Sequence, residues 1–367
     1  VYKRQGYLGY RATPAEGRAD DYVALVVSDT YDMADGRWRE LCTVPNPLVV
    51  AATVDGTPVS VADATNVETS FDARTGEVDL RYTVSVGAAT LSLRVRRFAS
   101  MADLHLLAQR WELTSDADVD VALDTAIDTA VWSLNGNHFA EMTVNDGTAV
   151  GQTVERGTTV VVAHEVAGAD ATRVTASAPV VVETTAACWS SNDDADPVAR
   201  AAQSVRAAAS LGYERARADS AAVWDAIWAD SDVTIDGPVA DQASLRFCLY
   251  HNRIATPAHT DHLPIGARGL SCQAYQGAAF WDQEVYNLPV FLYTQPEIAR
   301  RLLVYRQRTI DGACRKAARH GYEGAFYAWI SGDTGDELCP DVFYRDVLTG
   351  REIRNHFNLW QIHISPD

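Results

Sequence analysis

The sequence predicts a multidomain fold class of β followed by α, in which a β-sandwich precedes a helical region. Three observations support this prediction. Apolar and polar residues alternate with a period of two over residues 7–187. A cluster of turn and helix-capping residues, SSNDDADP at 190–197, then ends the alternation. Beyond it, apolar residues recur at helical spacing.

The strands are clearest in residues 78–86, where Val, Leu and Tyr alternate with Asp, Arg, Thr and Ser. After a Gly-Ala-Ala turn, the same alternation resumes at residues 91–95, which predicts a hairpin with one face in water. Residues 119–123 alternate as well, and β-branched runs occupy 158–162 and 180–185. Many short strands separated by Gly, Asn and Asp turns are typical of a sandwich.

The helices begin with residues 198–230, which are rich in Ala and Arg and suit one or two helices. Residues 241–253 predict another helix. Thr294 and Glu297 form a capping-box pattern before an apolar helix, and Gly321 is expected to end the helical stretch. Paired helices joined by Gly- and Pro-rich loops fit a helical toroid.

Composition and charge narrow the classes of partner. The chain has 367 residues, 47% of them apolar and 22% charged, which is typical of a globular protein of two or three domains. Its formal net charge of −18 repels nucleic-acid phosphates and anionic bilayers. The longest apolar stretches fall short of the ~20 residues that cross a bilayer. We therefore expect neither a nucleic-acid nor a membrane partner.

Residues 266–284, GARGLSCQAYQGAAFWDQE, concentrate glycines, aromatic residues and carboxylates. Sugars are bound by aromatic faces that cover C–H surfaces and by carboxylates that accept hydroxyl hydrogens. Tyr275, Trp281, Asp282 and Glu284 could supply these groups. The alternative is a Gly-rich turn in which Trp281 packs in the core and Asp282 caps a helix.

A second candidate stretch is residues 329–341, WISGDTGDELCPD. Its carboxylates suit hydroxyl acceptors, a general acid or base, or a calcium site, although no 12-residue calcium-loop pattern is present. The alternative is a loop of solvated carboxylates. The acidic residues concerned are Asp333, Asp336, Glu337 and Asp341.

The histidines give weaker signals. His259 and His262 have the spacing of a metal pair but lack a thiolate and a clear third ligand, so we expect no metal site. His356 and His363, near Trp360, are either site residues or core histidines, and their spacing does not choose between the two.

Several motifs occur together and in a fixed order along the chain. They are GYLG at 6–9, VPNP at 44–47, RFASMAD at 97–103, WDAIWADSDV at 224–233, GARGLS at 266–271, FWDQE at 280–284, WISGDTGDE at 329–337 and QIHISPD at 361–367. In these motifs the chain resembles glycoside hydrolase family 65, which includes maltose, trehalose, kojibiose and nigerose phosphorylases and acid trehalases.

The chain also departs from the family pattern. Residues 1–5 do not match the LGN that usually precedes GYLG. The other departures are Cys272 and Gln273 for Gly-Glu, Ala278 for His, Gln283 for Thr and Ile330 for Glu. The loss of a carboxylate at Ile330 removes an acceptor for sugar hydroxyls, so the resemblance does not identify the acceptor sugar.

The resemblance implies an N-terminal β super-sandwich at residues 1–190, a helical linker at 191–240, and part of an (α/α)6 barrel at 241–367 that is truncated at its C-terminus. It also implies cleavage of an α-glucosidic bond with inversion, in which a Glu protonates the leaving oxygen. That general acid is expected beyond Asp367, so no catalytic residue is assigned here and we expect the chain alone to be inactive. The substrate-binding residues that it implies are Trp281, Asp282, Trp329 and Asp333.

The expected function is that of a fragment of an inverting α-glucoside phosphorylase. Such an enzyme converts an α-linked glucose disaccharide and phosphate to β-glucose 1-phosphate and a sugar, with inorganic phosphate as co-substrate and no cofactor. The alternatives are a trehalase- or kojibiose-hydrolase-like enzyme of the same family and a non-catalytic carbohydrate-binding module. We expect a cytoplasmic location, and a homodimer is left open.

Overall fold

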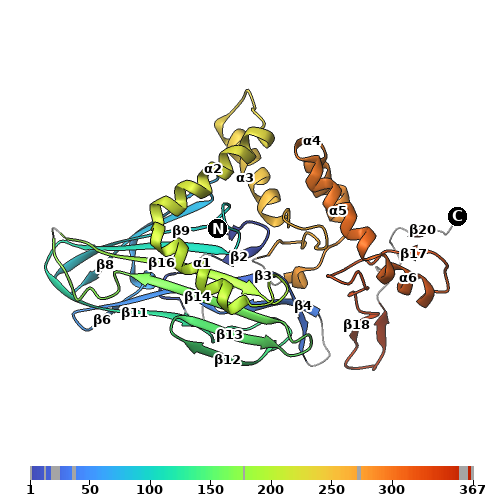
Figure 1. Ribbon diagram of the computed structural model, residues 1–367, viewed down its shortest axis with the longest axis horizontal. Coiled ribbons are helices and arrows are strands. Elements are labelled where there is room, and N and C mark those ends of the chain that lie inside the picture. The colour runs from blue at the N-terminus through green and yellow to red at the C-terminus, as the bar shows by residue number, and fades with distance from the viewer. Residues whose placement is uncertain are drawn as a thin grey trace.

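A computed structural model of the chain describes residues 2–11, 14–17, 25–34, 39–176, 178–270, 274–354 and 363–364 (Figure 1). The strands of the N-terminal half come first and the helices follow, as the sequence predicts. The helical region lies at the end of the strand region opposite β8 (Figure 1).

A large antiparallel sheet of eight strands forms the centre of the N-terminal half, in the order β12-β13-β14-β16-β10-β9-β8-β7. The predicted hairpin is confirmed: β8 and β9 pair from Val78↔Arg97 to Val86↔Ala89. Its turn is Gly87 and Ala88, and Gly87 has a φ of +58°. The strands are β7 (Thr65–Asp72), β8 (Glu77–Val86), β9 (Ala89–Ala99), β10 (Leu106–Ser115), β12 (Phe139–Asn145), β13 (Thr148–Thr153), β14 (Thr159–Ala167) and β16 (Val180–Ser190).

Two four-stranded sheets cover one face of the large sheet and complete a sandwich. One has the order β15-β11-β5-β6 and the other β1-β2-β3-β4. Each encloses its own apolar cluster against the large sheet, the first around Trp111 and the second around Phe139. The strands are β1 (Tyr2–Arg4), β2 (Leu8–Arg11), β3 (Leu25–Met33), β4 (Arg39–Val44), β5 (Asn46–Val54), β6 (Thr57–Val59), β11 (Val119–Asp128) and β15 (Arg173–Val174), and a 3₁₀ turn, Val61–Asp63, follows β6.

The opposite face of the large sheet carries helix α1 (Pro197–Leu211) (Figure 1). Asp196 caps this helix by accepting from Ala199 N at 3.0 Å, and Pro197 fills the first turn, where its missing N–H costs nothing. Ala201 and Val205 pack against Ala187 and the neighbouring strand. The segment predicted as a linker is therefore docked on the sandwich. The predicted boundaries at residues 190 and 240 stay predictions.

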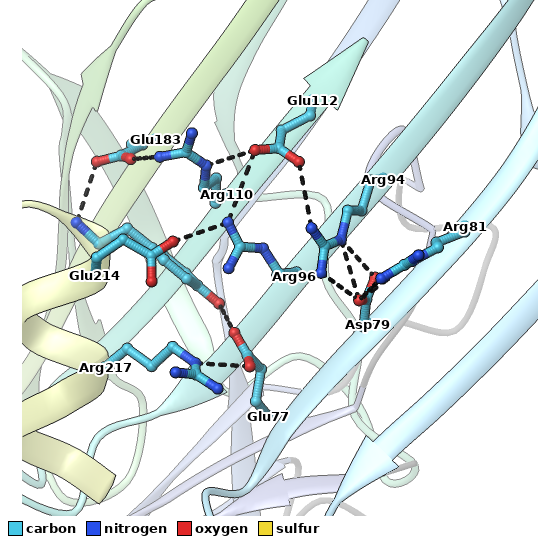
Figure 2. Close-up of polar contacts among 11 residues, drawn as sticks. Glu77, Asp79, Arg81, Arg94, Arg96, Arg110, Glu112, Glu183, Glu214 and Arg217 are labelled. Atoms are coloured by element: carbon cyan, nitrogen blue, oxygen red, sulfur yellow. Dashed lines mark hydrogen bonds and ion pairs between the residues drawn. The ribbon is translucent and has the colours of Figure 1, made fainter. Parts of the chain in front are cut away.

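Helix α2 (Tyr213–Ser231) is joined to the same face by a lattice of charges (Figure 2). Arg96 pairs with Glu214 at 2.9 Å, and Arg217 pairs with Glu77 at 2.7 Å. The Tyr213 hydroxyl donates to Glu77 at 2.7 Å. Arginines on one strand alternate with carboxylates on its neighbours, which is the arrangement that cross-strand pairing favours. The first turn of α2 is thus fixed to the sheet.

The helical region contains α3 (Val239–Ala255), a 3₁₀ turn Ala274–Gly277, a π-helical turn Gln283–Asn287, α4 (Leu288–Thr294), α5 (Pro296–Arg308) and α6 (Ile310–Arg319). Short strands follow: β17 (Ala325–Phe326), β18 (Val342–Arg345), β19 (Glu352–Arg354) and β20 (His363–Ile364). None of the described helices is long and apolar enough to span a membrane.

One predicted helix start is wrong. Thr294 does not cap α5, because it is the last residue of α4 and its hydroxyl donates to Val290 O at 2.6 Å. Gln295 takes the cap position without a side-chain hydrogen bond, and Pro296 begins the helix. At the other end, Gly321 follows the last cap as predicted, with a φ of +80°.

The GYLG motif lies where the sandwich meets the helical region. A Cβ on Gly6 would lie 2.1 Å from Thr256 O, and one on Gly9 would lie 2.6 Å from the carbonyl carbon of Leu270. Only glycine permits so close a backbone approach. Tyr31 adds a hydrogen bond from its hydroxyl to Gly277 O at 2.8 Å. The motif is thus a contact between the two regions.

Candidate functional site

The two candidate stretches found in the sequence, residues 266–284 and the acidic residues 329–341, lie side by side. Ala279 and Ser331 form an antiparallel bridge, with N–O distances of 2.8 and 2.9 Å. Tyr305 fixes the second stretch from α5, because its hydroxyl donates to Gly332 O at 2.6 Å. The fold therefore brings the residues after Gly266 and those after Trp329 into one place, although the sequence separates them by the helices α4, α5 and α6.

Aromatic rings lie beside the bridge that joins the two candidate stretches. The rings of Trp281 and Trp329 are 6.2 Å apart between centroids and tilted by 37°. Phe280 contacts Trp329 edge-on at 5.9 Å. Trp281 is 43% exposed, so the alternative in which it packs in the core is wrong. An exposed indole next to polar groups is a surface on which the C–H face of a sugar ring can rest.

The side chain of Asp282 has no hydrogen-bond or ion-pair partner among the described residues. It stands at the N-terminus of the π-helical turn but makes no capping hydrogen bond, so the alternative in which it serves as a helix cap is also wrong. An ionised carboxylate with both oxygens available can accept hydrogen bonds from sugar hydroxyls.

Asp333 is more buried, with 8% of its side chain exposed. Its Oδ2 pairs with the guanidinium of Arg156 at 2.5 Å, whereas its Oδ1 is buried without a hydrogen-bond partner among the described residues. Burial raises the pKa of Asp333 above its usual range, and Arg156 and Arg39 offset part of that rise. Half of this carboxylate is thus enclosed with its hydrogen bonding incomplete.

Two other candidate carboxylates are occupied by structural contacts. Glu284 makes a two-pronged ion pair with Arg306, at 2.8 and 3.0 Å. Glu337 is buried with Lys316 at 2.7 Å and also accepts from the backbone N–H groups of Trp329 and Ile330. Glu337 thus fixes loop backbone and Glu284 holds the Arg306 side chain, while their expected role as hydroxyl acceptors or as an acid or base stays a prediction.

The remaining acidic residues form surface ion pairs. Asp336 pairs with Arg315 at 2.7 Å, and Asp341 pairs with Arg319. The Asp336 and Asp341 side chains are 42% and 44% exposed, which agrees with the alternative of solvated loop carboxylates. Tyr275 is 46% exposed, and its ring lies 5.2 Å from that of Phe280.

The histidines are used elsewhere. The His259 ring contacts Tyr7 at 5.5 Å, and burial lowers the pKa of His259 to about 4. His262 approaches Asp29 at 3.3 Å. Within the described residues, no group of three or more His, Cys, Asp or Glu could hold a metal ion. His356, Trp360, Cys272 and Gln273 lie outside the described residues.

Sequence reasoning missed Arg156 and Arg39, which belong to the sandwich. They precede Asp333 by well over a hundred residues and stand in no motif. No local pattern could have placed them here.

Comparison with known proteins gives two family matches. The model described as "Glycosyl hydrolase family 65, N-terminal domain" matches residues 6–227, and the one described as "Glycosyl hydrolase family 65 central catalytic domain" matches residues 246–367.

Individual proteins that are similar to this chain carry names that agree with these family matches. A 1,2-alpha-glucosylglycerol phosphorylase of Bacillus selenitireducens is 47% identical over 386 residues, which cover 99% of this chain and 50% of the relative. A nigerose phosphorylase of Lachnoclostridium phytofermentans is 32% identical over 411 residues, 98% of this chain and 54% of the relative. The chain thus spans about half the length of these relatives. A solved structure described as "Putative kojibiose phosphorylase from human microbiome" shares the fold, with a TM-score of 0.82 at 19% identity over 92% of this chain and 50% of its own.

Proposed function

Because the chain belongs to glycosyl hydrolase family 65, we propose that it is the N-terminal half of an inverting α-glucoside phosphorylase. The two relatives with 47% and 32% identity, both named as phosphorylases, match nearly the whole chain and support this proposal. In the complete protein the helical region becomes part of an (α/α)6 barrel. The location is cytoplasmic, where inorganic phosphate is the co-substrate, and no cofactor takes part.

The site holds the glucose ring of the substrate. Trp281 and Trp329 cover its apolar face, and Asp282 and Asp333 accept its hydroxyl hydrogens. The observation that supports this assignment is the carboxylate of Asp282, which has no partner among the described residues, beside the exposed ring of Trp281. A Glu beyond Asp367 protonates the leaving oxygen while phosphate attacks the opposite face, which gives β-glucose 1-phosphate.

The first substrate to assay is 1,2-α-glucosylglycerol, after which the relative with 47% identity is named. Kojibiose, nigerose, maltose and trehalose are the comparison substrates. In the complete protein, glucose 1-phosphate should form only when phosphate is present. Equal release of free glucose without phosphate would instead support a hydrolase, and the 367-residue chain by itself should release neither product.

Asp282→Asn tests the site assignment. Asn keeps the shape and removes the charge, so stability should hardly change while kcat/KM falls by the equivalent of about 1.5 to 3 kcal/mol, the usual worth of a hydrogen bond to a charged group. Asp336→Asn is the matched control, because that carboxylate forms a surface pair with Arg315. Wild-type kcat/KM in Asp282→Asn would refute the assignment.

A further inference from the structure

The turn between β13 and β14 belongs to the sandwich but reaches the candidate site. It places Arg156 against Asp333, with 2.5 Å between Nη1 and Oδ2. Arg156 keeps 33% of its side chain exposed, whereas Asp333 keeps 8%. A residue of the N-terminal half thus contacts a predicted sugar-binding residue of the C-terminal half.

Three consecutive backbone N–H groups hold this turn. Val154 N donates to His138 O at 3.0 Å. Glu155 N and Arg156 N both donate to Asp32 Oδ1, at 3.0 and 3.1 Å. Hydrogen bonds from N–H groups to an ionised carboxylate are stronger than neutral ones. The turn is therefore fixed at the residue that carries the guanidinium.

A buried histidine lies beneath the turn and holds Asp32. His138 Nδ1 is 3.2 Å from Asp32 Oδ2, and its Nε2 is 2.8 Å from Glu40 Oε1. All three side chains are at most 1% exposed. Burial acts to lower the pKa of His138, but the hydrogen bonds to Glu40 and Asp32 outweigh it and raise that pKa. A charged imidazole can donate from both nitrogens at once, which fixes both carboxylates.

The other half of the contact is the incomplete hydrogen bonding of Asp333. Its Oδ1 is buried and has no hydrogen-bond partner in the part of the chain that the structure describes. An unpartnered buried acceptor costs free energy, and a bound hydroxyl would remove that cost. Because Arg156 holds Oδ2, it also sets the direction in which Oδ1 points.

We propose that Arg156 is a positioning residue that orients Asp333 for a hydrogen bond from a substrate hydroxyl, so that the β-sandwich builds part of the sugar site. This inference rests on the proposed function for the nature of the ligand. In this proposal the His138–Asp32 pair fixes the turn that carries Arg156. The sandwich and the helical region then both contribute residues to one sugar site.

The charge of Asp333 depends on groups from several elements. Arg156 from the turn and Arg39 from β4 lower its pKa, while Asp29 from β3 raises it. Tyr31 and Tyr305 also lie within electrostatic reach of it. Removal of Arg156 leaves Arg39 as the remaining cation, so burial should then keep Asp333 protonated up to a higher pH.

The test compares Arg156→Met with Arg173→Met in the complete enzyme. Arg173 is also on the sandwich but pairs with exposed Asp118 and Asp120. Arg156→Met should lower kcat/KM for the glucoside roughly tenfold or more, mainly through KM, and should move the acid limb of the pH profile upward. Arg156→Lys should recover part of the loss, and Arg156→Met should add little in an Asp333→Asn background.

Two outcomes overturn the inference. In one, Arg156→Met has the same kcat/KM as Arg173→Met. In the other, the double variant Arg156→Met with Asp333→Asn loses kcat/KM by the product of the two single losses. A readout without turnover separates this inference from the proposed function. Glucose binding, followed by quenching of tryptophan fluorescence, should weaken in Arg156→Met and not in Arg173→Met. If the wild type binds glucose but performs no phosphorolysis, the proposed function fails, and the binding assay still tests the inference. Equal glucose binding by Arg156→Met and Arg173→Met rejects the inference.

Discussion

The sandwich and the helical region differ in how completely they bury their large apolar side chains. The sandwich encloses Trp111 and Leu91 between its sheets. The helical region leaves Tyr293 at 86% exposure, Val239 at 85% and Tyr286 at 66%. A pair of sheets can close its own core, whereas the described helices present apolar faces that nothing described covers. The sandwich should therefore supply most of the independent stability.

The two regions also differ in where they place charge. The lattice of Figure 2 lies on the outer face of the sandwich and joins it to α2. In the helical region, Lys316 and Glu337 form an ion pair at 3% and 6% exposure under the second acidic stretch. Breaking a buried pair costs far more than breaking a surface pair. The site loops thus depend on a few buried charges.

The largest expected effect separates the two regions as fragments. A fragment of residues 2–231 should unfold cooperatively on heating, while residues 239–367 alone should show no cooperative transition. A fragment that ends at Asp196 should also fold, but with about 3 to 6 kcal/mol less stability, because it loses the burial of Val205 and Tyr213 against the sheet. Thermal unfolding followed by circular dichroism measures the stability of all three fragments. An unfolded 2–231 fragment beside a folded helical fragment would reverse the comparison.

The next effect concerns the buried charges. Glu337→Gln should destabilise the complete protein by about 3 to 5 kcal/mol, because Lys316 keeps its charge in a buried place without its partner. Chemical denaturation measures the free energy of unfolding. Asp336→Asn is the control in the same loop and should cost less than about 1 kcal/mol. Equal effects of the two substitutions would show that the loop does not depend on the buried pair.

The smallest effect concerns the surface lattice. Burial opposes the charge of Asp79, but hydrogen bonds from Arg94 and Arg81 lower the pKa of Asp79 to about 2. A lowered carboxyl pKa adds stability above the unfolded pKa of about 3.9, and this stability is lost as pH falls toward 2. Solvent screening leaves it at about 1 kcal/mol or less. Asp79→Asn should therefore lower the free energy of unfolding slightly at pH 7 and not at all near pH 2, as acid and thermal unfolding would measure.

Sequence patterns predicted the strands, the cluster of turn and helix-capping residues at 190–197 and the two stretches that form the candidate site. These features depend on local alternation and on turn residues. Local reasoning failed at Thr294, because a capping pattern cannot show whether the preceding helix already includes the residue.

Local sequence reasoning also failed to distinguish the carboxylates that form structural ion pairs from those that do not. Asp282 and Glu284 stand two residues apart, yet only Glu284 meets a guanidinium, and that guanidinium comes from α5. Glu337 meets its ammonium partner from α6. Which acidic residues are used for structure depends on partners that the fold brings from elsewhere, so the sequence left Asp282 and Glu337 equivalent. The sugar-binding roles of Trp281, Asp282, Trp329 and Asp333 stay predictions.

The contacts of Gly6 and Gly9 have a consequence for synthesis of the protein. Their partners, Thr256 and Leu270, follow them by about 250 residues. At about 5 to 20 residues per second, a ribosome takes roughly 12 to 50 seconds to make that interval. The backbone at Gly6 and Gly9 is therefore among the first parts to emerge, and its contacts with Thr256 and Leu270 are among the last to form. During that interval this backbone surface is open to chaperones and to wrong partners, so slower translation before residue 270 should prolong that exposure.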